Sequence, residues 1–276
     1  MKAGLAAYLV GVQAALDVCG GDLPAQLIFS SVLEEECGGN GMRAVLNHVG
    51  DRHPLLIGEP TGLDLHYAGV GVIWFRVTVA GTGAHAAFAH PDAPVDDLLA
   101  AVSALRSLEA DLNARRGDSV FCENLEHPFN LNLGVVGGGS WPSSVPEEVV
   151  LRGRLGFGRD LTPAQAQERV TRALGSLPRV QVAFDGFRAP AYAHRIDGHL
   201  GDAVRTAHAG HCGSAPEPRV DTFTTDARMA AGEALCYGPR AGAIHGRDEW
   251  VELDSVRQVA RTIARLVGSW GRGASG

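Results

Sequence analysis

The stretch GVIWFRVTVAG, residues 71–81, alternates apolar and polar side chains with a period of two. Its apolar side chains occupy every second position: Ile73, Phe75, Val77 and Val79. A strand with one face in a core and the other in water produces this alternation, because successive side chains point to opposite faces. The stretch therefore predicts a strand of a half-exposed sheet.

The segments that follow extend this strand into a recognisable module. A helix-like apolar pattern covers 93–112, and alternating patterns return at 129–135 and 149–155. Thr162-Pro163-Ala164-Gln165 then forms a capping box with proline at the first helical position, which predicts a helix up to Gly175. A last apolar strand at 180–184 completes the order βαββαβ, which is typical of a ferredoxin-like module.

The flanking sequence has a different pattern, in which short apolar runs alternate with helices. The runs 26–32 and 54–60 predict buried strands, and 41–49 predicts a helix between them. Residues 3–18 predict a buried helix that ends at two glycines. We therefore expect a mixed, mostly parallel α/β catalytic domain interrupted by the ferredoxin-like module. The expected boundaries are 1–68 and 187–276 for the two catalytic parts and 69–186 for the module.

Composition restricts the function. The formal net charge of −7 and the pI of about 5.9 leave no basic surface for nucleic acid. The first helix is too short and polar to cross a membrane, so no membrane partner is expected. Five dispersed cysteines predict reduced thiols and a cytoplasmic setting.

Acidic side chains follow both predicted strands of the flanking domain. Glu34, Glu35 and Glu36 come after the first strand, and Glu59 comes after the second. Ligands of open α/β sheets gather at the carboxyl ends of strands, so these acids can converge. On an extended backbone, neighbouring glutamates point in opposite directions, and one could hold a metal while the other moves a proton. The alternative is a solvated acidic turn, which the short motif by itself favours.

Four histidines and Glu59 are further candidate site residues, and each taken alone has both a functional and a structural interpretation. Pro60 keeps Glu59 out of the helical region at a strand end. His85 follows the 71–81 strand and is either structural or catalytic, and His245, in a loop of small residues, is a ligand or a surface residue. The pair His208 and His211 has metal-like spacing, but we expect a solvated helix end there.

Seven motifs in a fixed order resemble the dizinc amidohydrolase/peptidase family of acetylornithine deacetylase and succinyl-diaminopimelate desuccinylase. They span the chain almost from end to end: SVLEEECGGNG (31–41), LIGEPT (56–61), VTVAGTGAHAA (77–87), GVVGGGSWPSSVPEEVVLRGRLGF (134–157), TTDAR (224–228), CYGP (236–239) and IHGRDEWVEL (244–253). Each motif is weak alone, whereas the ordered set is specific.

The resemblance implies a metal-dependent hydrolase that cleaves the amide bond of N-acyl amino acids or small peptides. It implies two zinc ions per subunit, with cobalt or manganese as alternatives, and a homodimer formed through the module, which serves as a lid. Glu35 would be the general base and Glu36, Glu59 and His245 metal ligands, while His85 would reach the developing oxyanion across the dimer. The residues expected to hold the substrate carboxylate are Arg154, Asp226, Arg228 and Gly238. In such a site zinc lowers the pKa of bound water to about 7, and the carboxylate takes the proton of that water.

The sequence departs from this family at its start. Relatives carry two further ligands upstream, a histidine in His-x-Asp and a bridging aspartate directly before Met-Lys-x-Gly. This sequence begins Met1-Lys2-Ala3-Gly4, so both ligands and the first sheet strands fall before its first residue. Either the start is misassigned or truncated and the enzyme is longer, or the chain is a catalytically inactive relative that self-associates or binds a single metal. Loss of the first strands would expose apolar edges of the sheet, which is an aggregation risk. This favours the explanation that the start is misassigned or truncated. In addition, Arg154 falls two residues earlier than the arginine of many relatives.

Overall fold

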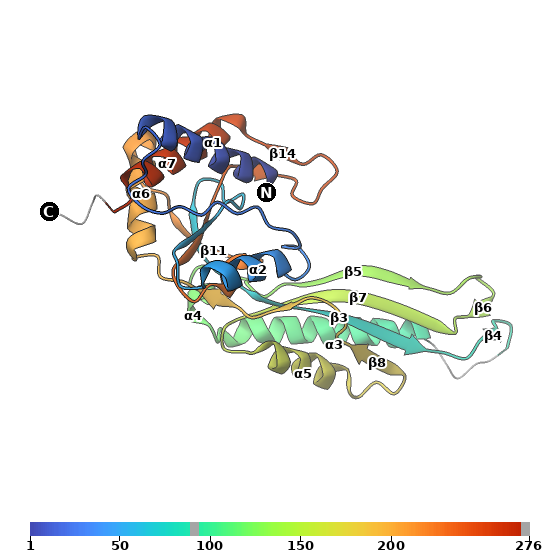
Figure 1. Cartoon of the computed structure of the whole chain (residues 1–276). Helices are drawn as coiled ribbons and strands as arrows, with labels where there is room; N and C mark the ends of the chain where they lie inside the picture. Colours follow the sequence, from blue (N-terminus) through green and yellow to red (C-terminus); the bar gives the residue numbers. More distant parts are fainter. Residues whose placement is uncertain (89–93, 272–276) are drawn as a thin grey trace. The chain divides into compact units, whose positions relative to one another are not determined.

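The computed structural model describes residues 1–88 and 94–271 (Figure 1). The chain forms two compact units. Unit 1 contains Met1–Ala68, Ala193–Val220 and the chain from Thr225 onward, and unit 2 contains Gly69–Tyr192 and Asp221–Thr224.

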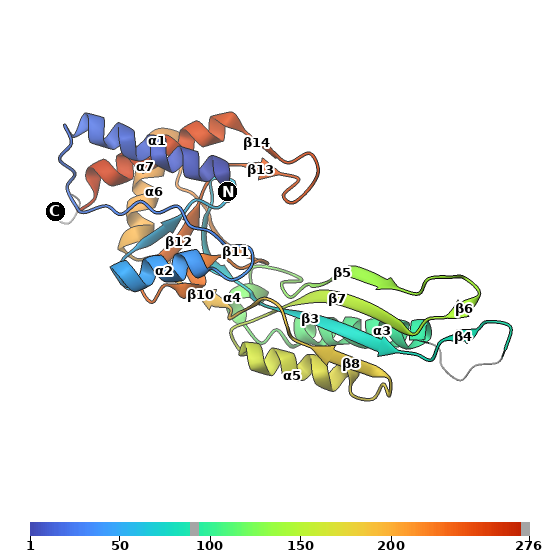
Figure 2. The same cartoon turned by 45° about the vertical axis from the view of Figure 1, so that its right-hand side comes forward.

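Unit 2 is built on an antiparallel sheet with the strand order β5-β7-β3-β8, in which β9 also pairs with β3. Helices α3 and α5 pack together on one face of this sheet (Figure 2). The bounds are β3 Gly71–Ala80, β4 Ala84–His85, α3 Pro94–Arg115, α4 Ser119–Cys122, β5 Leu131–Gly138, β6 Ser144–Val145, β7 Glu148–Phe157, α5 Pro163–Leu174, β8 Val180–Ala183 and β9 Arg188–Ala189. The order β3-α3-β5-β7-α5-β8 confirms the predicted βαββαβ module.

The predicted alternation decides which face of β3 is buried. Ile73, Phe75, Val77 and Val79 are buried beneath the helices, while Trp74 is exposed. The predicted capping box is present at α5, where the side chains of Thr162 and Gln165 each accept from the other's backbone N–H. Both features are local, which is why the sequence alone predicts them correctly.

The second sheet is mixed, with the order β1-β12-β2-β10 and β11 also paired to β2. Strands β1 and β12 run parallel, and β12 and β2 run antiparallel. The remaining bounds are α1 Lys2–Val18, α2 Asn40–Val49, β1 Leu55–Ile57, β2 Leu65–Gly69, β10 Tyr192–Ala193, α6 His199–Cys212, β11 Pro218–Asp221, η1 Asp226–Met229, β12 Ala234–Tyr237, β13 Ala241–Gly242, β14 Trp250–Val251 and α7 Leu253–Ser269. The predicted mixed α/β class is therefore confirmed. No helix in the described part of the chain is long and apolar enough to span a membrane.

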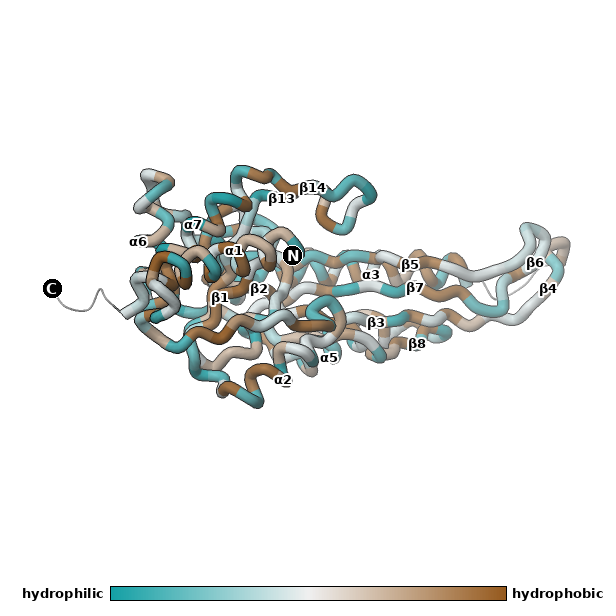
Figure 3. The backbone as a smooth tube through the Cα atoms, turned by 45° about the horizontal axis from the view of Figure 1, so that its top comes forward, coloured by the Kyte–Doolittle hydropathy of each residue, from teal (hydrophilic) through white to brown (hydrophobic). Residues whose placement is uncertain are grey.

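Helix α1 is present as predicted, but only one stripe of it is buried. Gly4, Ala7, Gly11 and Ala15 face inward, and α1 packs along α7. A Cβ on Gly11 would lie 2.6 Å from the carbonyl oxygen of Ala260, so the small side chain allows the two helices to approach closely. The leucines and valines of the other face are exposed, and Figure 3 shows hydrophobic residues along this helix. The predicted helix is present, but its burial is restricted to this one stripe.

The predicted strand at 26–32 is also wrong. These residues form an extended coil between α1 and α2 (Figure 1), and Phe29 is 39% exposed. A strand requires a neighbour that completes its hydrogen-bond ladder, and the segment joins no sheet in the described residues. An apolar run of this length predicts burial only when such a partner lies beside it.

Candidate functional site

The three consecutive glutamates lie in a tight turn of unit 1 that leads into α2. Glu34 has a φ of +63°, and its carbonyl oxygen accepts from the N–H groups of Gly38 at 3.1 Å and Gly39 at 2.7 Å. Its carboxylate accepts from the Asn40 side chain at 2.5 Å. The expectation of an extended backbone here was wrong, because Glu34 turns the chain. We refer to residues Glu34–Gly39 as the glutamate turn.

Glu36 lies beside His245, a residue 209 positions away in the chain. The Nε2 atom of His245 is 3.1 Å from a carboxylate oxygen of Glu36, and both side chains are 73% exposed. His245 lies in the loop between β13 and β14 and has a φ of +59°, a conformation that costs energy for any residue with a Cβ. So exposed a pair adds little to stability. The contact nevertheless brings two residue types that bind metals to one place.

Glu35 differs from its neighbours because it is half-buried. Burial raises the pKa of its carboxyl group to about 7, and the nearby charges of Asp226 and Glu36 add to the rise, while Arg228 and His245 oppose it. A carboxyl group with such a pKa can accept and release a proton near neutral pH. The sequence offered no sign of this shift, because Asp226 and Arg228, two of the charges that act on Glu35, lie far away in the chain.

Asp226 and Arg228 are buried beneath the glutamate turn. Their side chains are 1% and 3% exposed, and they form an ion pair at 3.3 Å. Burial raises the pKa of Asp226 and the Arg228 charge lowers it. The Nη2 atom of Arg228 also donates to the carbonyl oxygen of Gly38 at 3.2 Å. Both residues therefore contact the turn that carries the glutamates.

Glu59 and Gly238 lie together where β1 and β12 end. Gly238 donates its N–H to the Thr61 hydroxyl at 2.9 Å, and a Cβ at this position would overlap the carbonyl oxygen of Glu59. The absence of a side chain at Gly238 therefore allows the backbone of the Glu59 turn to approach. The described residues contain no group of three or more His, Cys, Asp or Glu side chains able to hold a metal ion. Glu36, Glu59 and His245 thus do not form a three-ligand site.

Two further predicted residues belong to unit 2. His85 is exposed on β4, where its Nδ1 atom accepts from the Ala87 N–H at 3.1 Å and its ring meets Trp141 edge-on. It lines a hollow of about 620 Å³. Arg154, on β7, is half-buried and donates to the carbonyl oxygen of Thr222 at 3.3 Å, and burial lowers its pKa.

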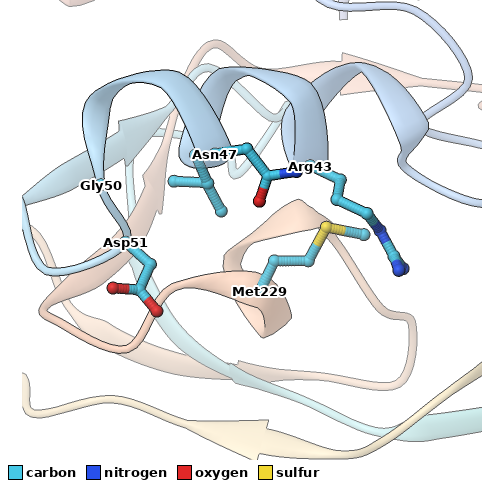
Figure 4. A pocket seen from close by; sticks show the side chains of 6 residues that line it. Arg43, Asn47, Gly50, Asp51 and Met229 are labelled. Atoms are coloured by element: carbon cyan, nitrogen blue, oxygen red, sulfur yellow. The ribbon is translucent and has the colours of Figure 1, made fainter.

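Unit 1 also contains a hollow of about 460 Å³ that includes none of the predicted site residues. Figure 4 shows Arg43 and Asn47 projecting from α2 and Met229 rising from η1. The complete lining is Arg43, Leu46, Asn47, Gly50, Asp51 and Met229.

The histidines of α6 form part of a buried network that the sequence did not predict. The Tyr237 hydroxyl lies 2.7 Å from Nδ1 of His208 and 3.0 Å from the Thr262 hydroxyl, which is in turn 2.9 Å from Nε2 of His211. His208 is buried, so the expectation of a solvated helix end was wrong. The spacing of the two histidines places both on one face of a helix, and the partner they meet there is set by the tertiary fold.

The sequence profile described as "Peptidase family M20/M25/M40" matches residues 1–269. A probable carboxypeptidase of Aspergillus clavatus is 30% identical over 55% of this chain and 38% of its own length. A probable carboxypeptidase of Paracoccidioides brasiliensis is 24% identical over 96% of this chain and 60% of its own length. The matched region therefore covers 60% or less of the length of these relatives.

A solved structure shares the fold at low sequence identity. The crystal structure of human carnosine dipeptidase 1 matches with a TM-score of 0.72 and 14% identity, over 97% of this chain and 71% of that one.

Proposed function

The chain belongs to peptidase family M20/M25/M40, and on that basis we propose that it hydrolyses the amide bond of a small peptide or an N-acyl amino acid. The names of the related proteins, probable carboxypeptidases and a dipeptidase, support peptides as the substrate class. Deacylation of N-acyl amino acids is the same bond cleavage with a simpler acyl group.

The observation that carries this proposal is the convergence of Glu35, Glu36 and His245 in unit 1. Glu35 is half-buried beside the exposed Glu36–His245 contact. In the proposed reaction Glu35 takes a proton from the attacking water and delivers it to the leaving amine, which is general base and then general acid catalysis. Proton transfer by a positioned carboxylate of this kind contributes about 10²–10⁴-fold to a rate.

Unit 2 and the ends of the second sheet supply the other proposed roles. His85 would donate a hydrogen bond to the developing oxyanion, and unit 2 would act as the lid through which a homodimer forms. Arg154 would face the substrate carboxylate, because a guanidinium matches that anion with two parallel donors. Gly238 would belong to the turn that helps to hold the substrate carboxylate, where its lack of a side chain lets the Glu59 turn approach.

Zinc is the metal we propose for the family reaction, but the residues of this chain do not by themselves form its site. Glu36, Glu59 and His245 are of the types that zinc binds, and zinc in a catalytic site takes three protein ligands. As placed, they form no group of three. The reaction steps above therefore involve only side chains of this chain.

Because Glu36, Glu59 and His245 do not group together, a second candidate function is also considered: a noncatalytic relative that self-associates or binds one metal. Val135 and Val136 are exposed on β5, which is an edge strand of its sheet. An edge strand that carries exposed apolar side chains is a template for pairing with another chain.

One experiment separates the two candidates. Hydrolysis of a dipeptide panel and of N-acetyl amino acids would be followed with and without added zinc, for the wild type, for Glu35→Gln and for Glu168→Gln. Glu168 is an exposed glutamate on α5 that serves as the matched control. The first candidate predicts turnover that Glu35→Gln abolishes and Glu168→Gln preserves. Self-association in light scattering, with no turnover at any zinc concentration, would instead support the second.

A further inference from the structure

The loop that carries Asp226 and Arg228 is fixed within unit 1. Thr225 caps η1 by accepting from the Ala227 N–H at 3.2 Å, and the Thr225 hydroxyl lies 3.4 Å from the Cys236 sulfur on β12. Nε2 of His194 lies 2.8 Å from the carbonyl oxygen of Ala227. Contacts with two separate parts of the unit therefore hold the segment that presents the buried ion pair.

From this fixed segment the ion pair meets the glutamate turn at two successive residues. Arg228 donates to the carbonyl oxygen of Gly38. At Gly39, which has a φ of +74°, a Cβ would lie 2.5 Å from Oδ1 of Asp226 and 2.8 Å from Nη2 of Arg228. The turn thus lies directly on the ion pair, and only a glycine fits at the closest point.

The exposure of these side chains argues against direct contact with a substrate. A guanidinium that binds a substrate carboxylate has to face the space that the substrate enters, whereas the Arg228 side chain is 3% exposed. Its Nη2 atom donates to the carbonyl oxygen of Gly38, and its Nη1 atom lies 3.3 Å from the Asp226 carboxylate. Neither carboxylate oxygen of Asp226 has a hydrogen bond that meets normal geometry, so the ion pair with Arg228 is what compensates the buried charge.

We propose that Arg228 and Asp226 are positioning residues, which hold the glutamate turn and thereby set where the Glu35 and Glu36 carboxylates lie. This role replaces the contact with a substrate carboxylate that the sequence suggested. Its kinetic consequence rests on the proposed function, whereas its structural consequence does not. When the contacts of Arg228 with the turn are removed, the glutamate turn should open more often. Glu35 should then spend less time in the position from which it can accept a proton from water.

The structural test is amide hydrogen exchange of Gly38 and Gly39 in the full chain without added metal or substrate. The Gly39 N–H donates to the Glu34 carbonyl oxygen, so its exchange reports whether the turn is closed. In Arg228→Met, which keeps the length of the side chain but removes its donors, we expect exchange at least about tenfold faster, the size expected when a charge-assisted hydrogen bond is lost. Arg43→Met is the control, because Arg43 is an exposed arginine on α2 that lines the hollow in Figure 4. It should exchange like the wild type.

The kinetic test separates positioning from substrate binding. Loss of positioning should lower kcat by about tenfold or more with little change in KM, because the interaction acts on the reacting groups. Loss of a substrate anchor should raise KM and leave the exchange of the turn unchanged, and that combination would overturn the proposal. Arg228→Lys should restore part of both properties, since it keeps the charge but not the planar fork.

The remaining outcomes are also decisive. If Arg228→Met does not fold, Arg228→Lys replaces it, and we expect exchange at least about threefold faster than in the wild type; wild-type exchange would refute the positioning role. If the wild type hydrolyses no substrate, the proposed function fails, but the exchange comparison still decides whether Arg228 holds the turn.

Discussion

Replacing Tyr237 by phenylalanine should measurably destabilise unit 1. The Tyr237 side chain is fully buried on β12, and its hydroxyl joins His208 of α6 to Thr262 of α7 at 2.7 and 3.0 Å. Burial raises the pKa of this hydroxyl, so it stays protonated at neutral pH. The substitution removes one oxygen atom from the point where two helices and a strand meet.

The expected loss of stability depends on which hydrogen bonds Thr262 and His208 keep after the substitution. Each intramolecular hydrogen bond contributes about 0.5–1.5 kcal/mol net, and a buried group left without a partner costs about 1–3 kcal/mol. Thr262 still contacts His211 and donates to the carbonyl oxygen of Gln258 at 3.0 Å, so it is not orphaned. His208 loses its partner at Nδ1 in a buried position. We therefore expect Tyr237→Phe to lower the free energy of unfolding by about 2–3 kcal/mol.

Urea unfolding followed by circular dichroism at pH 7.5 measures this change. Tyr8→Phe is the matched comparison, because it removes a single hydrogen bond, from the Tyr8 hydroxyl to the carbonyl oxygen of Tyr237, at a partly buried site. We expect a loss of about 1 kcal/mol there. If Tyr237→Phe loses less than about 0.5 kcal/mol, or no more than Tyr8→Phe, the network does not stabilise the unit and the reasoning is wrong.

Four further predictions test other parts of the chain. Burial and neighbouring positive charge lower the pKa of His208, so its protonation favours the unfolded chain as the pH falls below about 6.5, whereas the raised pKa of Glu35 acts in the opposite direction. In Glu35→Gln, which lacks the opposing group, the urea midpoint should therefore fall between pH 7.5 and 5.5, and an unchanged midpoint would contradict the prediction. Asp118→Asn should destabilise unit 2 by about 1–3 kcal/mol in thermal unfolding, because the buried carboxylate caps α4 and pairs with Arg159. The contribution of the ion pair is reduced because Arg159 is partly exposed to solvent. Gly238→Ala should cost about 2 kcal/mol or more through overlap with backbone, whereas Gly137→Ala, with nothing within 4 Å, should stay within about 0.5 kcal/mol of the wild type; similar midpoints for both would show that the backbone relaxes freely. Phe29→Ser should reduce light scattering by concentrated protein with little change in stability, and unchanged scattering would exclude this exposed segment as a cause of association.

Features that depend on a few neighbouring residues could be predicted from the sequence. The alternation in 71–81 specified the buried face of β3, and the capping box at Thr162 specified the start of α5. In both cases the interactions act within about one turn or one strand pair, so the sequence contains the whole cause. The ordered motifs in the same way identified the family, which the match over residues 1–269 shows.

Features that depend on a distant partner could not be predicted. The apolar run 26–32 has the composition of a buried strand, yet it forms an exposed coil because no strand among the described residues pairs with it to complete a ladder. His208 looked like part of a solvated helix end, and it is buried because Tyr237 and α7 cover it.

Some features of the candidate site likewise follow from the local sequence, and others depend on distant segments. The sequence by itself determined that three glutamates follow one another and that two glycines come after Cys37, which permits a tight turn. Only the tertiary structure decided that His245 lies beside Glu36 and that the charges of Asp226 and Arg228 act on the half-buried Glu35, because these residues come from segments about two hundred positions away. Side-chain identity is local information, whereas the burial and charge that adjust the chemistry of a side chain come from whichever segments the fold packs against it.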